Sequence, residues 1–299
     1  MVLLVAAALA ASRTSLCCSI CRCGDATFNA LGSNIYSPGA FRLAVDWERF
    51  DKAQGPADDR ESTVENRVTA TLSYSFADRV NLVARIPVSF RTLAMPNGGM
   101  SDSLSTSGLS DPEFSAWVRL WASALSPGVG RRSWVSLVGG VKTPWGRNNL
   151  SEGGVRLDEH AQAGTGSTDV FFGISLFYLI DPSSSAFVSV QYRHTGTNSH
   201  EYKYGNIALA NVAYERKLGS VVDAVVEMNY RHAQRDRVDA GGDLDSNTGG
   251  DILYFTPRVI VDLGRGFLGR AAVQIPLVKR PYGDQTERVV VNAGLTLLF

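Results

Sequence analysis

From residue 39 onward the chain alternates apolar and polar residues with a period of two, in about twelve stretches separated by turn residues. The first stretch sets an apolar face against a polar one: Phe41, Leu43, Val45 and Trp47 against Arg42, Asp46 and Glu48. This alternation is typical of a β-strand with one dry side and one wet side. The pattern therefore predicts an all-β protein.

Several of these stretches run to ten or more residues, as in 64–76, 80–91 and 222–231. Strands of soluble β-sandwiches are usually five or six residues long, whereas a strand that crosses a bilayer at a tilt needs about ten. The wet faces also carry full charges, which a packed sandwich core could not bury unpaired. The stretch 206–217 has small apolar residues on both faces, so its orientation stays open.

The connections between stretches alternate in length. Short turns are expected near residue 78 and at 181–184, 218–220 and 263–266, with a somewhat longer one at 125–132. Polar, Gly-containing loops are expected at 51–60, 92–107, 144–166 and 234–249. Bacterial barrels keep short turns and both chain ends in the periplasm and have an even number of strands. The sequence thus predicts a transmembrane up-and-down antiparallel β-barrel of about 12 strands over 39–299, surrounded by outer-membrane lipid.

The last stretch places an apolar residue at every second position back from Phe299: Val289, Val291, Ala293, Leu295 and Leu297. A terminal Phe on an alternating final strand is the signal that the barrel-assembly machinery reads on many outer-membrane proteins. We therefore expect Phe299 to act as an assembly signal, with that machinery as a partner.

The first residues contain the apolar run VLLVAAALAA, which is too short to span a bilayer as a helix. Residues 1–11 are interpreted as a signal peptide, with Ala8 and Ala10 offering a small-residue cleavage site, although no Lys or Arg precedes the run. Residues 12–38 then form a Cys-containing periplasmic segment before the barrel.

That segment holds all four cysteines of the chain: Cys17, Cys18, Cys21 and Cys23. Thiols at this spacing can bind a soft metal such as zinc or copper, or form disulfides in an oxidising periplasm. No His follows the CxxC pair directly, so covalent haem attachment is not indicated, and no cofactor is expected.

Several stretches resemble the outer-membrane transporter family that is grouped with meta-pathway phenol-degradation proteins. The resemblance is carried by the opening strand FRLAVDWERF, the Pro-containing strands ARIPVSF, GVKTPWG and AVQIPLVK, and the closing VNAGLTLLF. It implies a signal peptide before an even-stranded barrel that passes small molecules. The Cys-rich segment before Gly24 departs from the family pattern.

Charge is balanced, with 29 basic and 29 acidic residues, and no basic stripe suggests nucleic acid. The wet faces predict that the lumen is lined by Arg42, Asp46, Glu48, Glu65, Arg67, Arg85, Arg91, Glu113, Arg119, Lys142, Asp169, Arg193, Asp223, Glu227, Arg231, Arg258 and Arg270. These charges either orient a solute in a narrow polar channel or close the interior by ion pairs, as in small barrels.

Three strands carry a proline near their outer ends: Pro87, Pro144 and Pro276. Because proline removes a ladder donor, each favours a bulge or the end of pairing. The three prolines indicate either strands that end at the same membrane height or a constriction below the outer mouth.

Two further groupings have a chemical and a structural interpretation. His194, His200 and His232 lie at outer strand ends and either bind a metal at the mouth or belong to the interfacial girdle, which we favour. Ser189 or Ser199 with His194 would form the pair of a lipid hydrolase. No acidic partner or oxyanion motif accompanies them, so we predict no enzyme.

The function predicted from the sequence is passive or facilitated passage of a small polar or aromatic solute across the outer membrane. The alternative is a closed structural or binding barrel, whose Cys-rich segment plugs the lumen or docks a periplasmic partner. Single-channel conductance separates the two.

Overall fold

A computed structural model describes residues 39–54, 61–77, 79–97, 100–123, 133–238 and 242–299. The signal peptide, the Cys segment and the possible metal ligands Cys17, Cys18, Cys21 and Cys23 lie outside these residues. The strands are β1 (Phe41–Gln54), β2 (Glu61–Ala77), β3 (Val80–Asn97), β4 (Met100–Leu109), β5 (Glu113–Ala122), β6 (Ser133–Lys142), β7 (Ser151–Glu152), β8 (Val155–Arg156), β9 (Asp169–Asp181), β10 (Ser184–His194), β11 (Ile207–Lys217), β12 (Val222–Ala233), β13 (Gly250–Gly264), β14 (Phe267–Pro281) and β15 (Gln285–Leu298).

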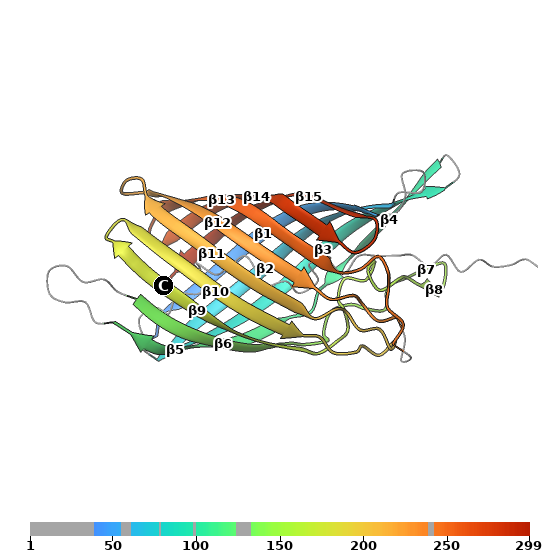
Figure 1. The fold of residues 1–299 in the computed structure, drawn as a ribbon, viewed down its shortest axis with the longest axis horizontal. Coiled ribbons are helices and arrows are strands. Elements are labelled where there is room, and N and C mark those ends of the chain that lie inside the picture. The colour runs from blue at the N-terminus through green and yellow to red at the C-terminus, as the bar shows by residue number, and fades with distance from the viewer. Residues whose placement is uncertain (1–38, 55–60, 78, 98–99, 124–132, 239–241) are drawn as a thin grey trace, which may run out of the picture.

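The strands close into one barrel (Figure 1). Every pairing is antiparallel, β15 returns to β1, and a β2–β3 pairing completes the circle. β4 pairs with the loop-end half of β3, and β5 pairs with the half of β3 near the short turns. β4 and β5 therefore form one wall strand that is interrupted at 110–112. The short β7–β8 ladder stands apart. The wall therefore has twelve strands, which confirms the predicted fold class.

The alternation of the sequence becomes the two faces of this wall. On β1, Leu43 and Val45 are 40% and 45% exposed, whereas Ala44 and Asp46 between them are 1% and 4% exposed. The exposed face is apolar around the barrel, and the covered face points into the lumen. No helix among the described residues is long and apolar enough to cross a membrane. A closed barrel with an apolar outer wall is the architecture of a bacterial outer-membrane protein.

The orientation of β11, which the sequence left open, is settled by its neighbours. Val212 and Tyr214 are 53% and 41% exposed, while Leu209 and Ala213 are buried inside. Alanines complete the outer face. Because both faces of this strand are largely apolar, the sequence pattern could not show which face contacts lipid.

Short turns and both barrel ends of the chain share one end of the cylinder, the end drawn at the left of Figure 1. There the Phe41 ring stacks on Tyr74 at a centroid distance of 4.5 Å and on Phe299 at 5.8 Å. The Phe41 and Phe299 main chains exchange hydrogen bonds of 2.7 and 3.0 Å. Aromatic side chains at this position are typical of the girdle at a membrane interface. This end is therefore the periplasmic one.

Of the two segments expected as loops at 51–60 and 92–107, residues 51–54 and most of 92–107 are strand in the structure, and 55–60 lie outside the described residues. β1 extends to Gln54, and the segment expected as a loop at 92–107 is a hairpin that continues β3 and β4 beyond the barrel (Figure 1). The interpretation as a loop followed the Ser- and Gly-rich composition. Alternating Ser and Thr are compatible with a strand, and the pairing of β4 with β3 decides the matter.

The prolines do not mark a common end of three strands. β6 does end two residues before Pro144, but β3 continues ten residues beyond Pro87 to Asn97, and β14 continues beyond Pro276 to Pro281. Pro87 faces the interruption between β4 and β5, and Pro276 lies next to a register shift. Because each of these prolines lacks a backbone N–H, the strand pairing is irregular beside it, but the strand does not end there.

Candidate functional site: the barrel interior

All the charged residues expected in the lumen lie on the inner side of the wall. The buried ones are Arg42, Asp46, Glu65, Arg67, Arg91, Glu113, Lys142, Asp169, Arg193, Glu227, Arg231, Arg258 and Arg270. Glu48, Arg85, Arg119 and Asp223 are partly exposed. Charges of both signs thus converge on the same enclosed space, where each needs a partner.

Five of these side chains, together with Asp111, make a continuous set of contacts along the inner wall in the outer half of the barrel. We call the set Arg85, Glu113, Arg193, Asp169, Lys142 and Asp111 the ion-pair chain. Its successive N···O distances are 3.3, 2.7, 4.0, 2.8 and 3.4 Å. Its members stand on the consecutive wall strands β3, β5, β6, β9 and β10, with Asp111 just before β5, so the chain follows the inner face of one side of the barrel.

Separate ion pairs hold other parts of the inner wall. The Glu65 carboxylate receives Arg67 and Arg91, each at 2.8 Å, and the Ser89 hydroxyl, also at 2.8 Å. On the far side, Asp46 pairs with Arg270 at 2.6 Å and Glu227 with Arg258 at 2.7 Å. Arg91–Glu65 and Arg258–Glu227 join neighbouring strands, whereas Arg270 on β14 reaches Asp46 on β1 across the intervening β15. All three carboxylates are charge-compensated.

The loop between β6 and β9, residues 143–168, folds back into the outer opening, and we call it the mouth loop. Asp111 accepts hydrogen bonds from the main-chain N–H of Gly146 at 2.9 Å and of Thr165 at 2.7 Å. Arg91 donates to the carbonyls of His160, at 2.8 Å, and Gln162. Wall side chains thus fix the loop by its backbone.

Two glycines allow the mouth loop to fold this tightly. A Cβ on Gly146 would lie 2.6 Å from Asp111 Oδ1, and one on Gly164 would lie 2.7 Å from the Gly146 Cα. Any larger residue would push the loop away from Asp111. The close approach explains why glycine occupies both positions.

A buried cluster joins the mouth loop to two further outer loops. His160, Tyr202, Tyr204 and Asp236 form this three-loop cluster, with the His160 ring 5.5 and 5.3 Å from the two tyrosine rings. Tyr202 Oη donates to Asp236 at 2.7 Å and lies 2.8 Å from His160 Nε2. Because the hydroxyl has one proton, His160 Nε2 must donate to it. Burial, and then the Asp236 charge, raise the pKa of Tyr202.

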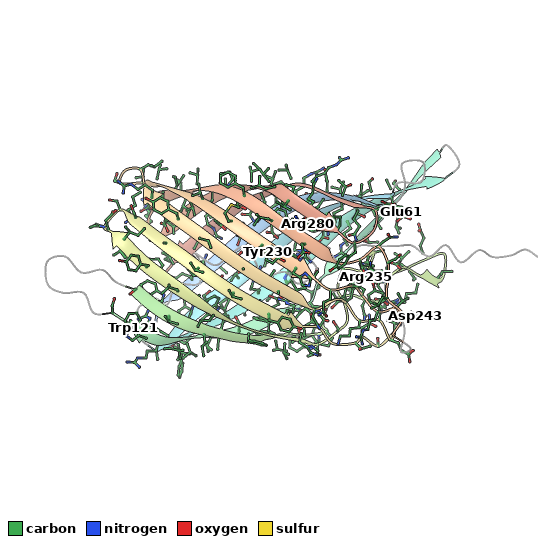
Figure 2. All side chains as sticks on the ribbon, in the orientation of Figure 1. Glu61, Trp121, Tyr230, Arg235, Asp243 and Arg280 are labelled. Atoms are coloured by element: carbon green, nitrogen blue, oxygen red, sulfur yellow. The ribbon has the colours of Figure 1, made fainter. Side chains whose placement is uncertain are left out.

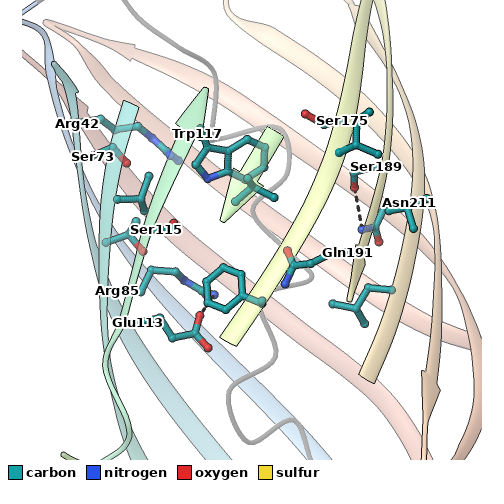
Figure 3. Close-up of a pocket in the computed structure, with 17 residues that line it drawn as sticks. Arg42, Ser73, Arg85, Glu113, Ser115, Trp117, Ser175, Ser189, Gln191 and Asn211 are labelled. Atoms are coloured by element: carbon teal, nitrogen blue, oxygen red, sulfur yellow. Dashed lines mark hydrogen bonds and ion pairs between the residues drawn. The ribbon is translucent and has the colours of Figure 1, made fainter. Parts of the chain in front are cut away.

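Below the ion-pair chain lies a cavity of about 60 Å³ between opposite walls (Figure 3). Its lining is mixed. Trp117, Val138, Phe171 and Leu209 supply apolar surface, and Arg85, Glu113, Ser115, Gln191 and Asn211 supply charge and hydrogen-bonding groups. Figure 3 shows the Trp117 indole reaching into the space between the two walls. A cavity of this kind suits a small molecule with an apolar body and a polar substituent.

Closer to the periplasm the interior turns apolar. Phe187, Ala213 and Val225 are buried together, and Phe177 and Ile260 pack against them; we call these five the apolar cluster. Trp134 stacks on Phe177 with centroids 4.0 Å apart and planes at 14°. These residues were not predicted from the sequence, because the candidate lumen residues were the charged ones. Their inward parity, as for Val225 between Asp223 and Glu227, was the signal that could have found them.

The histidine and serine groupings do not form sites. Ser189 faces the interior, where its hydroxyl accepts from Asn211 at 3.2 Å, whereas His194 on the same strand is exposed on the outer face. His232 contacts Asp251 at 3.0 Å on the outside of the wall. Within the described ranges, no group of three or more His, Cys, Asp or Glu is arranged to hold a metal ion.

Comparisons with known proteins support the fold. No protein-family model and no curated protein matches the chain. Among solved structures, a COG4313 outer membrane channel from Pseudomonas putida F1 superimposes with a TM-score of 0.68 at 11% identity, covering 89% of this chain and 98% of that one. The translocator domain of the autotransporter NalP from Neisseria meningitidis gives 0.49 at 10% identity, with coverages of 89% and 90%. The first likeness establishes the twelve-stranded fold at a distance where sequence no longer reports it.

Proposed function

We propose that this barrel is an outer-membrane channel for passive or facilitated passage of small solutes that combine an aromatic or other apolar body with one polar group. The mixed lining of the interior cavity carries the proposal. Trp117 and Phe171 offer ring surface, and Arg85 and Gln191 offer donors on opposite sides. The similar solved structure is named as an outer membrane channel, which supports the class of function.

On this proposal a solute enters past the mouth loop, and the ion-pair chain stands between the mouth and the cavity. Two of its carboxylates can exchange partners, because Glu113 contacts both Arg85 and Arg193 and Asp169 contacts both Lys142 and Arg193. The charged residues of the inner wall then orient the solute, which is the role expected of them from the sequence.

A disulfide that ties the mouth loop to the wall tests this route. Thr106 on β4 donates to the Ala161 carbonyl at 2.9 Å, so these two positions are in direct contact and are the ones chosen for the cysteines. In a background with Cys17, Cys18, Cys21 and Cys23 replaced by Ser, we expect oxidised Thr106→Cys/Ala161→Cys protein to pass a small phenol into liposomes at least tenfold more slowly than the reduced form.

The matched control is Glu152→Cys/Val155→Cys, which closes the tip of the mouth loop on itself at the β7–β8 ladder without tying it to the wall. Its flux should not depend on oxidation. Equal flux through oxidised and reduced Thr106→Cys/Ala161→Cys would mean that solute does not pass the mouth loop.

The buried ion pairs and docked loops also favour a second candidate, the closed structural or binding barrel. Inserted wild-type protein that stays silent in a planar bilayer and gives no phenol flux would support that candidate against the channel. Discrete openings would support the channel.

A further inference from the structure

Two arginines on the outer face owe their orientation to irregularities in adjacent strands. On β14, Arg270, Ala272 and Gln274 face the lumen, and Arg280 would do the same if the alternation continued. On β15, Val290, Asn292 and Thr296 face the lumen, and Arg288 would follow them. In the structure both Arg280 and Arg288 are exposed on the outside.

A β-bulge in each strand causes this reversal. The β13–β14 register shifts between Leu253 and Tyr254, which leaves Leu277 as the extra residue. The β1–β15 register shifts between Phe50 and Lys52, which sets Arg288 and Val289 together opposite Asp51. Each bulge moves one arginine from the water-filled side of the wall to its lipid side.

The two arginines lie on strand ends that have separated. Pairing between β14 and β15 stops at Gln274 and Val290, although β14 continues to Pro281 along β13 and β15 begins at Gln285 along β1. Arg280 and Arg288 therefore stand on either side of a split in the wall. A ligand that accepts hydrogen bonds from both would bridge the split.

Their height matches the outer boundary of the membrane. With a rise of about 3.3 Å per residue and a tilt of about 40°, Arg280 lies roughly 33 Å and Arg288 roughly 25 Å above the periplasmic ends of their strands, whereas the apolar band of such barrels is about 25 Å tall. Figure 2 shows Arg280 and Tyr230 on the same side of the barrel, toward its loop end. Arg49, also exposed on the outside, stands on the next strand, β1.

Each of the two arginines faces one carboxylate on the neighbouring strand. Asp251, which faces Arg280 across the β13–β14 pairing, also accepts from Tyr230 and contacts His232 at 3.0 Å. Asp51 stands opposite Arg288. A guanidinium has five N–H donors, so Arg280 and Arg288 can each contact the facing carboxylate and still donate to a phosphate.

From this geometry we infer a binding site for the phosphorylated glycolipid headgroup of the outer leaflet on Arg280 and Arg288. A phosphate presents several acceptor oxygens, and guanidinium groups bind it bidentately. Basic residues just beyond an apolar band are the usual way in which membrane proteins recognise anionic headgroups. The apolar side chains Leu277, Val278 and Val289, exposed beside them, would contact the acyl chains.

The test uses full-length protein refolded in zwitterionic detergent and bisphosphorylated lipid A as the probe, with binding read by native mass spectrometry. We expect Arg280→Gln/Arg288→Gln to bind at least tenfold more weakly than wild type. The matched control Arg79→Gln/Arg216→Gln removes two exposed arginines at the periplasmic end and should bind like wild type.

Two further measurements keep the result interpretable. Heat-modifiable migration of each variant on a gel shows whether it has folded, and Arg280→Lys/Arg288→Lys should recover part of the affinity if a variant with Gln is unstable. Equal lipid A binding by wild type and Arg280→Gln/Arg288→Gln would overturn the inference. Displacement of lipid A by millimolar inorganic phosphate would also overturn it, since the site would then bind free anions.

Discussion

The two ends of the lumen are built from opposite kinds of side chain. At the outer end, the ion-pair chain and the mouth loop are held by charge-assisted hydrogen bonds, centred on Lys142 and Asp111. At the periplasmic end, the apolar cluster around Phe187 is held by packing alone. Ion pairs can exchange partners without opening a void, whereas packed rings cannot. The difference assigns adjustable contacts to the mouth and rigid ones to the base.

Removing the central cation of the mouth should have the largest effect. Lys142→Met leaves the buried carboxylates of Asp111 and Asp169 without this cation, and we expect about 3 kcal/mol lower free energy of unfolding, the cost typical of breaking a buried pair. Denaturant titration in detergent, followed by the heat-modifiable band, measures it. Lys142→Met/Asp111→Asn/Asp169→Asn should recover most of the loss; no recovery would mean that the charge is not the cause.

Truncating a ring at the base should cost somewhat less. Phe187→Ala opens a cavity against Val225 and Phe177, and we expect a loss of about 2.5 kcal/mol, near the lower end for buried Phe because water can enter from the lumen. The same titration serves. Val188→Ala is the matched control, since Val188 is the next residue and faces lipid. Similar losses for both variants would contradict the description of the base as a packed cluster.

A smaller effect is expected from one carboxyl in the mouth loop. Burial raises the pKa of Asp158 above its ordinary value of 3.8. A group whose pKa is raised on folding stabilises the fold fully only below its unfolded pKa, and that contribution is lost as the pH rises through the folded pKa. At neutral pH, Asp158→Asn should therefore stabilise the docked loop, by about 0.5 kcal/mol, while keeping an acceptor for the His160 N–H.

Amide hydrogen exchange in the mouth loop, corrected for intrinsic rates, reports this change. Protection of the wild-type loop should fall as the pH rises above 3.8, and the Asp158→Asn loop should not follow it. A parallel pH dependence in both proteins would assign the titration to another group.

The wall was predictable from sequence because lipid and water impose a strict period of two on every strand. That constraint placed Arg85 and Lys142 inside and Val226 outside without any knowledge of pairing. It failed where the period is broken by a bulge, as at Arg288, because an extra residue reverses the faces without changing composition. The period of two did not single out Phe187, because an apolar residue on the inner face carries no charge to mark it.

The contacts of the mouth were not predictable for another reason. Asp111 binds the backbone of Gly146 and Thr165, and Arg91 binds carbonyls of the same loop. Hydrogen bonds to the main chain do not depend on the residue types of the loop. The composition of the mouth loop therefore predicted only that the loop is polar. The small residues Gly146 and Gly164 were the one trace of its close docking.

The three-loop cluster has a consequence for the order in which the barrel forms. His160, Tyr202 and Asp236 come from loops separated by β9, β10, β11 and β12. The three-loop cluster can therefore form only once these four strands are in place. Until then the nascent cylinder keeps an open, hydrated top, and its inner charges can find their partners before water is squeezed out.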